Sequence, residues 1–148
     1  GLGECVRLRG ESDQIHRKLA ECTALLMPSR FEGLPIVLLE SKTAGLPAIA
    51  YADCNGPNDL ISNGVDGLLV QPDETGKTFA DAIVWLSQHP DKLKAFQQAA
   101  VEMSAAYLPE HVVNKWIEMI EFVGSQSFRE FQDYQIPEFS SREALSDA

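Results

Sequence analysis

Short apolar runs alternate with longer amphipathic segments along the first half of the chain. Runs of this length, bounded by turn residues, are typical of strands in a buried sheet. In one run apolar and charged residues alternate, whereas the other three are almost wholly apolar. Together they predict four strands, at residues 5–9, 24–27, 47–51 and 67–70.

Between and after these runs, apolar residues recur at helical spacing. Ser12 suits the N-cap of a helix that reaches about residue 22, and Pro35 suits the first position of one that stops at Gly45. A short helical turn is predicted at 58–62 and longer helices at 79–88, from Asp91 to about 107, and from Pro109 onward, where Trp116 lies on a predicted apolar face. The polar tail after Gly124 has a short helix predicted at 127–134.

Alternating strands and helices indicate an α/β fold, a Rossmann-like doubly wound parallel sheet with helices on both faces. Such sheets bind their ligands at the carboxyl ends of the strands. We expect one domain over residues 1–123 and a polar tail over 124–148. Four strands are few for this architecture, so one or two βα units are expected to be missing from the front.

The composition narrows the classes of partner. The net charge is −10, which argues against nucleic acid and against an anionic membrane surface. A small anion remains possible, because backbone amides at a helix start bind one without cationic side chains. Three cysteines at long spacings argue against a disulfide framework or a zinc site. No signal peptide and no apolar run near ~18 residues is visible, so the cytoplasm is the predicted location.

The segment from residue 28 to residue 40 holds the candidate chemistry. It joins a predicted strand to a predicted helix and contains Glu32 and Glu40, with seven residues between them. Amides at the start of the helix, together with its dipole, form a predicted anion site at Gly33, Leu34 and Ile36. A carboxylate accepts hydrogen bonds from hydroxyls, so two carboxylates beside an anion site suit a nucleoside diphosphate sugar.

Both glutamates also have a purely structural interpretation. Glu32 would favour the dipole of the following helix, and Glu40 would be a solvated helix residue. The neighbours of Glu40, residues 36–39, are all apolar, which predicts a helix buried on most sides, where a charge needs partners. Functional roles are therefore favoured for both.

This segment resembles glycosyltransferase family 4, the glycosyl transferases group 1 of the GT-B architecture, whose members carry Pro-Ser-x-x-Glu-Gly-x-x-x-x-x-x-Glu. Matching segments follow at residues 44–50, 56–61 and 63–70, and the resemblance covers about residues 6–122. The Gly-Pro-x-x-Leu-Ile form at residues 56–61 is similar to that of bacterial transferases that build capsule, exopolysaccharide or lipopolysaccharide.

The resemblance implies the donor-binding half of a retaining hexosyltransferase, with a UDP- or GDP-sugar as donor. Glu32 would be the catalytic contact to the donor sugar and Glu40 would hold the ribose. Further donor contacts are implied at Gly33, Leu34, Pro35 and Ile36, with Gly10 and Ser12 near the base. No metal and no other cofactor is expected, since the chain has no Asp-x-Asp.

The family's basic diphosphate clamp and its acceptor-binding domain would precede Gly1, so the chain alone is expected to lack transfer activity. The acceptor, a saccharide or a lipid-linked saccharide, would be held by that domain, and the full-length enzyme would be cytoplasmic or peripheral to the membrane. An unpaired sheet edge is also expected, and self-association through that edge is a hypothesis.

A non-catalytic binding module is the alternative function. An epimerase and a dinucleotide oxidoreductase are disfavoured, the latter because no Gly-x-Gly-x-x-Gly follows a strand.

Two basic residues outside the motif receive structural interpretations. Arg30 is interpreted as a solvated or domain-interface arginine, with a phosphate contact as the alternative. His16 is interpreted as a surface histidine, because it has no partner at the spacing of metal ligands.

Overall fold

The computed structural model describes residues 3–125, so the helix predicted at residues 127–134 lies outside the described part. The elements follow in the order α1 (Ile15–Ala20), β1 (Leu25–Met27), α2 (Ile36–Thr43), β2 (Ala48–Tyr51), α3 (Asn55–Leu60), β3 (Gly67–Val70), α4 (Lys77–Gln88), α5 (Pro90–Ser104), the 3-10 turn η1 (Ala105–Tyr107) and α6 (Pro109–Ser125).

The sheet has three parallel strands in the order β1-β2-β3. Leu26 lies beside Ile49, and Ile49 beside Leu68, so the central strand is paired on both edges. All four residues of β2 are buried, as expected for a strand covered on both faces. The predicted α/β parallel sheet is therefore confirmed.

The strand predicted at residues 5–9 is wrong. The segment is exposed and pairs with no strand within residues 3–125, and Leu8 is 97% exposed. Alternation of apolar and charged residues gives a strand only where a neighbouring strand takes up its hydrogen bonds and a core takes up its apolar side.

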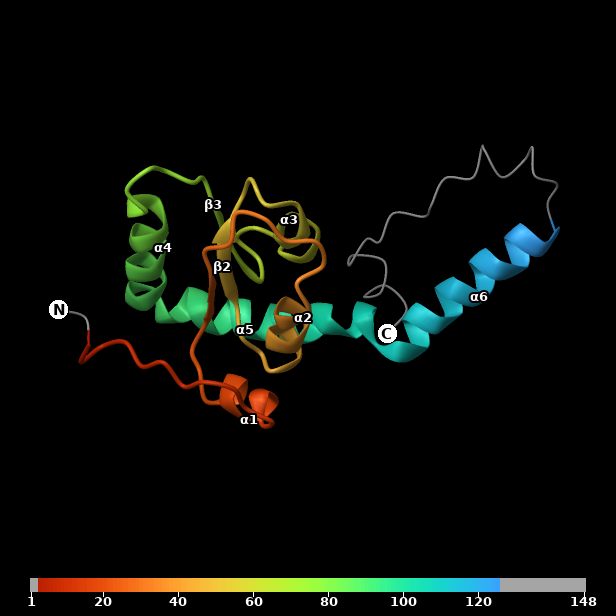
Figure 1. Cartoon of the computed structure of the whole chain (residues 1–148), viewed down its shortest axis with the longest axis horizontal. Coiled ribbons are helices and arrows are strands. Elements are labelled where there is room, and N and C mark those ends of the chain that lie inside the picture. Colours follow the sequence, from red (N-terminus) through yellow and green to blue (C-terminus); the bar gives the residue numbers. More distant parts are fainter. Residues whose placement is uncertain (1–2, 126–148) are drawn as a thin grey trace.

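Two apolar clusters lie on opposite faces of the sheet. Leu38 of α2 and Leu60 of α3 pack on one face, while Phe79 and Leu86 of α4 pack on the other with Phe96 of α5. Figure 1 shows this arrangement, with α4 on one side of β2 and β3, α2 and α3 on the other, and α5 crossing below. The predicted doubly wound arrangement, with helices on both faces, is present.

A buried ion pair ties α2 to the turn before β3. The Lys42 ammonium group donates a hydrogen bond to the Asp66 carboxylate, and the two side chains are 5% and 0% exposed. The second oxygen of Asp66 accepts a hydrogen bond from the Ser62 amide at 2.9 Å. Burial raises the pKa of the nearby Tyr107, and the charges of Asp66 and Asp59 act in the same direction. The sequence pattern did not predict this pair.

Asp73 caps the start of α4. Its carboxylate accepts hydrogen bonds from the Thr75 hydroxyl at 2.6 Å, the Thr78 amide at 2.7 Å and the Thr78 hydroxyl at 2.7 Å. These bonds, the one from the Thr75 side chain first, hold the pKa of Asp73 well below its ordinary value. The carboxylate thereby satisfies amides that the first turn of a helix leaves unpaired.

Replacing Asp73 by alanine should lower the melting temperature at neutral pH, because α4 loses this acceptor. Since folding depresses the pKa of Asp73, the stabilisation is present above the ordinary aspartate value of about 3.9 and is lost as the pH falls below it. Thermal unfolding of the wild type and Asp73→Ala, at about pH 7 and about pH 3, checks this. Glu74→Ala is the control, and a difference that is equal at both pH values would contradict the assignment.

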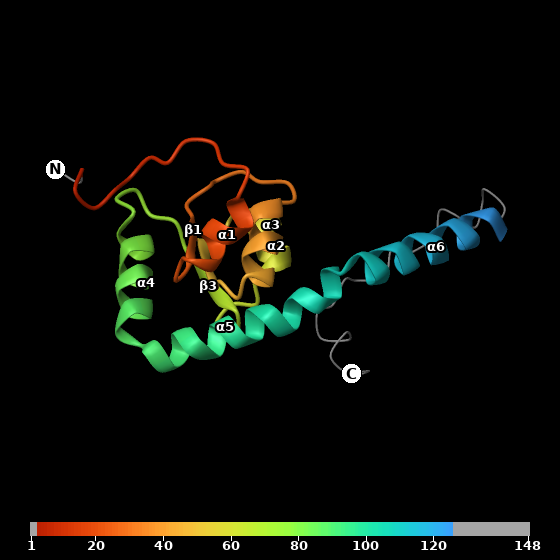
Figure 2. The same cartoon turned by 90° about the horizontal axis from the view of Figure 1, so that it is seen from below.

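α6 extends away from the α/β body (Figure 2). Its predicted apolar face is largely uncovered, with Trp116 58% and Ile120 63% exposed. In the part of the chain described, this face therefore does not pack into the core. Within that same part, no helix combines the length and the apolar character that a membrane span requires.

Candidate functional site

The connection from β1 to α2 lies at the carboxyl end of β1 and is held against the start of α3. A Cβ atom added to Gly56 would lie 2.2 Å from the carbonyl oxygen of Gly33 and 2.7 Å from Cδ of Pro35. Only a glycine lets two backbones approach this closely. The loop that carries Glu32 and Gly33 therefore rests directly on the backbone of α3.

The start of α2 presents unpaired amides. Pro35 occupies the N-cap, one position before its predicted place, and its carbonyl accepts a hydrogen bond from the Leu38 amide at 2.9 Å. Within residues 3–125 no acceptor pairs with the amides of Gly33, Leu34 or Ile36. These three amides and the helix dipole give the loop a partial positive charge, as predicted for an anion site.

Gly33 has open space above it. A Cβ atom placed there would meet nothing within 4 Å, and its φ lies outside the left-handed region. The fold does not require a glycine at this position, in contrast to Gly56. Two of the residues that follow it are also open, with Leu34 61% and Ile36 57% exposed, whereas Pro35 between them is buried. A ligand can therefore reach the three free amides.

Glu40 lies at the edge of the core. The prediction that α2 is buried on most sides is wrong at this face, because α2 buries Leu38, Ser41 and Lys42 while Ile36 stays open. Ile36 and Glu40 are four residues apart and share that open face. The Glu40 side chain is 28% exposed. Glu32 is half-buried in the loop that precedes the helix.

His16 reaches the Glu40 carboxylate from α1. Its Nε2 lies 4.0 Å from Oε1 of Glu40, and its side chain is 74% exposed. The prediction of a surface histidine is confirmed, but the sequence did not indicate this neighbour. The spacing of 24 residues between the two has no local periodicity, so the contact arises only from the packing of α1 against α2.

Gly10 and Ser12 lie in the loop that leads into α1. Gly10 adopts a φ of +68°, which favours glycine. The helix starts at Ile15 rather than directly after Ser12, and the Ser12 hydroxyl accepts a hydrogen bond from the Gln14 amide at 3.1 Å. Glu11, Ser12 and Asp13 line a shallow, open depression here. The loop thus precedes the helix whose His16 approaches Glu40.

Arg30 has an aromatic partner. Its guanidinium carbon lies 5.6 Å from the centroid of the Tyr51 ring, at the end of β2, and Tyr51 packs edge-to-face on Phe79 at 5.1 Å. A cation over an aromatic face is weakly attracted to it. This contact lies on the α4 side of the sheet, whereas α2 and Glu40 belong to the other side.

Comparison with known proteins identifies the family. The family model described as "Glycosyl transferases group 1" matches residues 1–103. The chain belongs to this family. It is 35% identical over 120 residues to an exopolysaccharide phosphotransferase of Streptomyces coelicolor and 34% identical over 119 residues to the amylovoran biosynthesis glycosyltransferase AmsD of Erwinia amylovora. Each match covers 80% of this chain, but only 13% and 33% of the respective relatives.

Solved glycosyltransferase structures share the fold. The pneumococcal O-GlcNAc transferase GtfA, in complex with UDP and GlcNAc, superposes with a TM-score of 0.73 at 22% identity, over 84% of this chain and 25% of that one. Anabaena HepE in complex with UDP gives a TM-score of 0.73 at 23% identity, over 85% of this chain and 34% of that one. The predicted GT-B architecture is therefore confirmed, and the chain spans about a third or less of these proteins.

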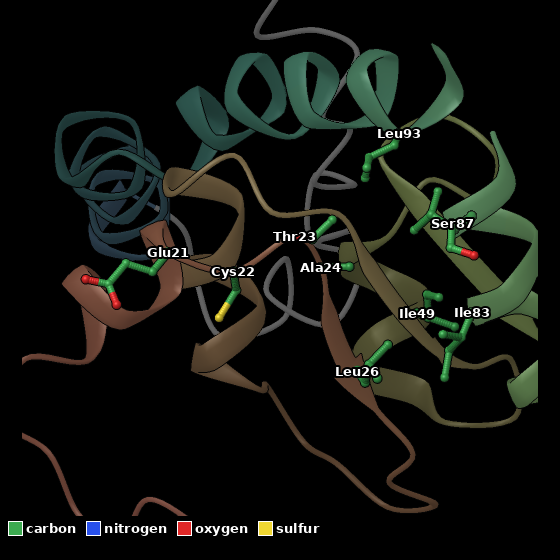
Figure 3. Close-up of a pocket in the computed structure, with 10 residues that line it drawn as sticks. Glu21, Cys22, Thr23, Ala24, Leu26, Ile49, Ile83, Ser87 and Leu93 are labelled. Carbon is green, nitrogen blue, oxygen red and sulfur yellow. The ribbon is translucent and has the colours of Figure 1, made fainter. Parts of the chain in front are cut away.

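A cavity of this glycosyl transferases group 1 domain lies apart from the candidate site. It measures about 450 Å³ and lies between β1 and α4, where Figure 3 shows Ile83 close to Leu26 and Ile49. Beside it, β1 forms one edge of the described sheet, and Leu26 is 46% exposed. Self-association through this edge stays a prediction.

Of the predicted residues of the β1–α2 connection, Gly33, Leu34 and Ile36 are exposed, Glu32 and Glu40 are half-buried, and Pro35 is buried. No group of three or more His, Cys, Asp or Glu side chains suited to a metal ion occurs within residues 3–125. The residue set itself, and the absence of a cofactor, stay predictions. His16 and Gly56 join the candidate site from the structure. The Gly-Pro pair at residues 56–57 was the only sequence signal for either of them.

Proposed function

We propose that this domain binds the nucleotide-diphospho-sugar donor of a retaining, family 4 glycosyltransferase. The observation that carries the proposal is the start of α2, where three unpaired amides lie between Glu32 and Glu40 on an open face. Membership of the glycosyl transferases group 1 family supports it. So do the fold neighbours that were solved with UDP bound.

Each part of the face takes one part of the donor. The amides of Gly33, Leu34 and Ile36 receive the diphosphate, which carries the negative charge. Glu40 accepts hydrogen bonds from the ribose hydroxyls, and Glu32 from the hydroxyls of the donor sugar. Pro35 shapes the connection as the N-cap of α2, and the loop at Gly10 and Ser12 lies toward the base.

In the transfer step, the bond between the anomeric carbon and the diphosphate oxygen breaks, and an acceptor hydroxyl attacks from the same face of the sugar and passes its proton to the leaving diphosphate oxygen. This route retains the anomeric configuration. The charge that develops on the leaving diphosphate is stabilised by the preorganised amides rather than by a metal. Glu32 is the side chain of this domain assigned to the reacting sugar.

We place the full-length enzyme in bacterial surface polysaccharide or lipopolysaccharide synthesis. The names of its relatives support this, including a lipopolysaccharide 1,6-galactosyltransferase of Salmonella typhimurium that is 44% identical over 58 residues. The acceptor, a saccharide or a lipid-linked saccharide, is assigned to the part of the relatives that this chain does not span. The 148 residues alone would then bind the donor without turnover. A non-catalytic binding module is the alternative.

Glu40→Ala should weaken the binding of UDP by about tenfold to a hundredfold, because hydrogen bonds to a charged group are worth about 1.5–3 kcal/mol. Calorimetric titration with UDP, GDP, UDP-glucose and GDP-mannose identifies the base that wild-type protein prefers. Glu118→Ala, on exposed α6, serves as the control and should bind as the wild type does.

Two outcomes would contradict the proposal. One is a folded wild-type chain that binds none of the four nucleotides. The other is a Glu40→Ala variant that binds with wild-type affinity, which would move the ribose away from α2. Tight binding combined with absent transfer by a full-length protein would favour the alternative of a binding module.

A further inference from the structure

We propose that His16 and Glu40 act as a donor–acceptor pair that holds one ribose hydroxyl of the nucleotide. The inference rests on the proposed function and adds a ligand contact from α1 to it. Nε2 of His16 lies 4.0 Å from Oε1 of Glu40, and the two side chains come from different helices that meet at the open face of α2.

The separation fits a bridging hydroxyl. A distance of 4.0 Å is too long for a direct hydrogen bond between the two atoms. A hydroxyl oxygen about 2.8 Å from each atom fits beside a gap of this width, with an angle of about 90° at the oxygen. A hydroxyl group can donate and accept at once. The hydroxyl would donate a hydrogen bond to the Glu40 carboxylate and accept a hydrogen bond from the Nε2–H of His16.

Neighbouring charges leave this pair available. On α1, Arg17 has its own carboxylate, with Nε 3.7 Å from Oε1 of Glu21. On α2, Lys42 is buried against Asp66. The Glu40 carboxylate therefore has the His16 imidazole as a neighbour in the described chain, and this imidazole is 74% exposed and open to a ligand.

The position of His16 is fixed by the core beneath it. Leu19, one turn further along α1, is 6% exposed, and α1 packs against α2. α1 therefore presents His16 beside Glu40 without requiring the imidazole itself for folding. An imidazole that carries a proton on Nε2 can serve as the donor of such a hydrogen bond.

The pair can be tested with two ligands and four proteins. Wild type should bind UDP more tightly than 2′,3′-dideoxy-UDP, which lacks both ribose hydroxyls. His16→Ala should weaken UDP binding by about threefold to tenfold, the range for one hydrogen bond of about 0.5–1.5 kcal/mol. It should leave the binding of 2′,3′-dideoxy-UDP unchanged. His16→Gln, whose amide can donate, should recover part of the loss, and Arg17→Ala should behave as wild type.

Each outcome separates the two proposals. If wild type prefers UDP over the dideoxy analogue and His16→Ala binds both ligands as wild type does, the role of His16 is overturned and that of Glu40 stands. If His16→Ala weakens both ligands equally, His16 acts through structure, and the inference is again overturned. If folded wild-type protein binds neither UDP nor GDP, the proposed function falls, and the assignment of His16 falls with it.

Discussion

Replacing Lys42 by methionine is expected to lower the free energy of unfolding by about 3–5 kcal/mol, the usual cost of leaving a buried charge without its partner. Lys42 and Asp66 are 5% and 0% exposed, so the remaining Asp66 carboxylate has no water to replace the ammonium group. Asp66 also holds the amide of Ser62 and thereby the turn into β3. The substitution therefore weakens the attachment of α2 to the third strand.

Urea unfolding followed by circular dichroism measures the loss. Lys77→Met is the matched control, because Lys77 pairs with Asp81 on the surface, where the side chains are 74% and 63% exposed. Exposed pairs contribute little, so this variant should unfold close to the wild type. Adding Asp66→Asn to Lys42→Met removes the orphaned charge and should restore part of the stability. Equal effects of Lys42→Met and Lys77→Met would contradict the assignment.

The sequence predicted the central part of the fold because local residue patterns determine its strands and helix ends. β2 and β3 are continuous apolar runs, and Gly45, with a φ of +69°, ends α2 where a left-handed residue was expected. The errors concern elements whose packing depends on distant segments. Residues 5–9 have the alternation of a strand without a partner, and α6 has an apolar face that the described residues leave largely uncovered.

In the candidate site too, features of one contiguous segment were predicted, whereas features that depend on tertiary packing were not. Glu32, the free amides and Glu40 lie within nine consecutive residues, so one motif and the rules for helix starts predicted their arrangement. The exposure of Glu40, the approach of His16 and the support by Gly56 depend on how α1 and α3 pack against α2. The Lys42–Asp66 pair escaped prediction for a related reason, because a lysine inside a helix is ordinarily solvated.

Replacing Gly56 by alanine is expected to displace the loop that carries the candidate site. Its Cβ would lie 2.2 Å from the carbonyl oxygen of Gly33 and 2.7 Å from Cδ of Pro35, so one of the two backbones must move by about 1 Å to reach an ordinary contact. Overpacking of this kind costs about 1–3 kcal/mol of stability. Because the displaced loop carries the free amides, the affinity for UDP should fall by more than about tenfold.

The comparison with Gly33→Ala separates support of the loop from contact with the ligand. A Cβ at Gly33 meets nothing within 4 Å, so this variant should unfold as the wild type does. Its affinity for UDP should nevertheless be lower than that of the wild type, because the new methyl group occupies the space above the amides. Gly124→Ala, another open position, controls for the substitution itself. Thermal unfolding and calorimetric titration of the three variants measure the stability and the affinity for UDP.

If Gly56→Ala lost stability but kept its affinity for UDP, the donor could not lie on the β1–α2 connection. If Gly33→Ala kept its affinity while Gly56→Ala lost it, the diphosphate would lie on the far side of the loop from Gly33.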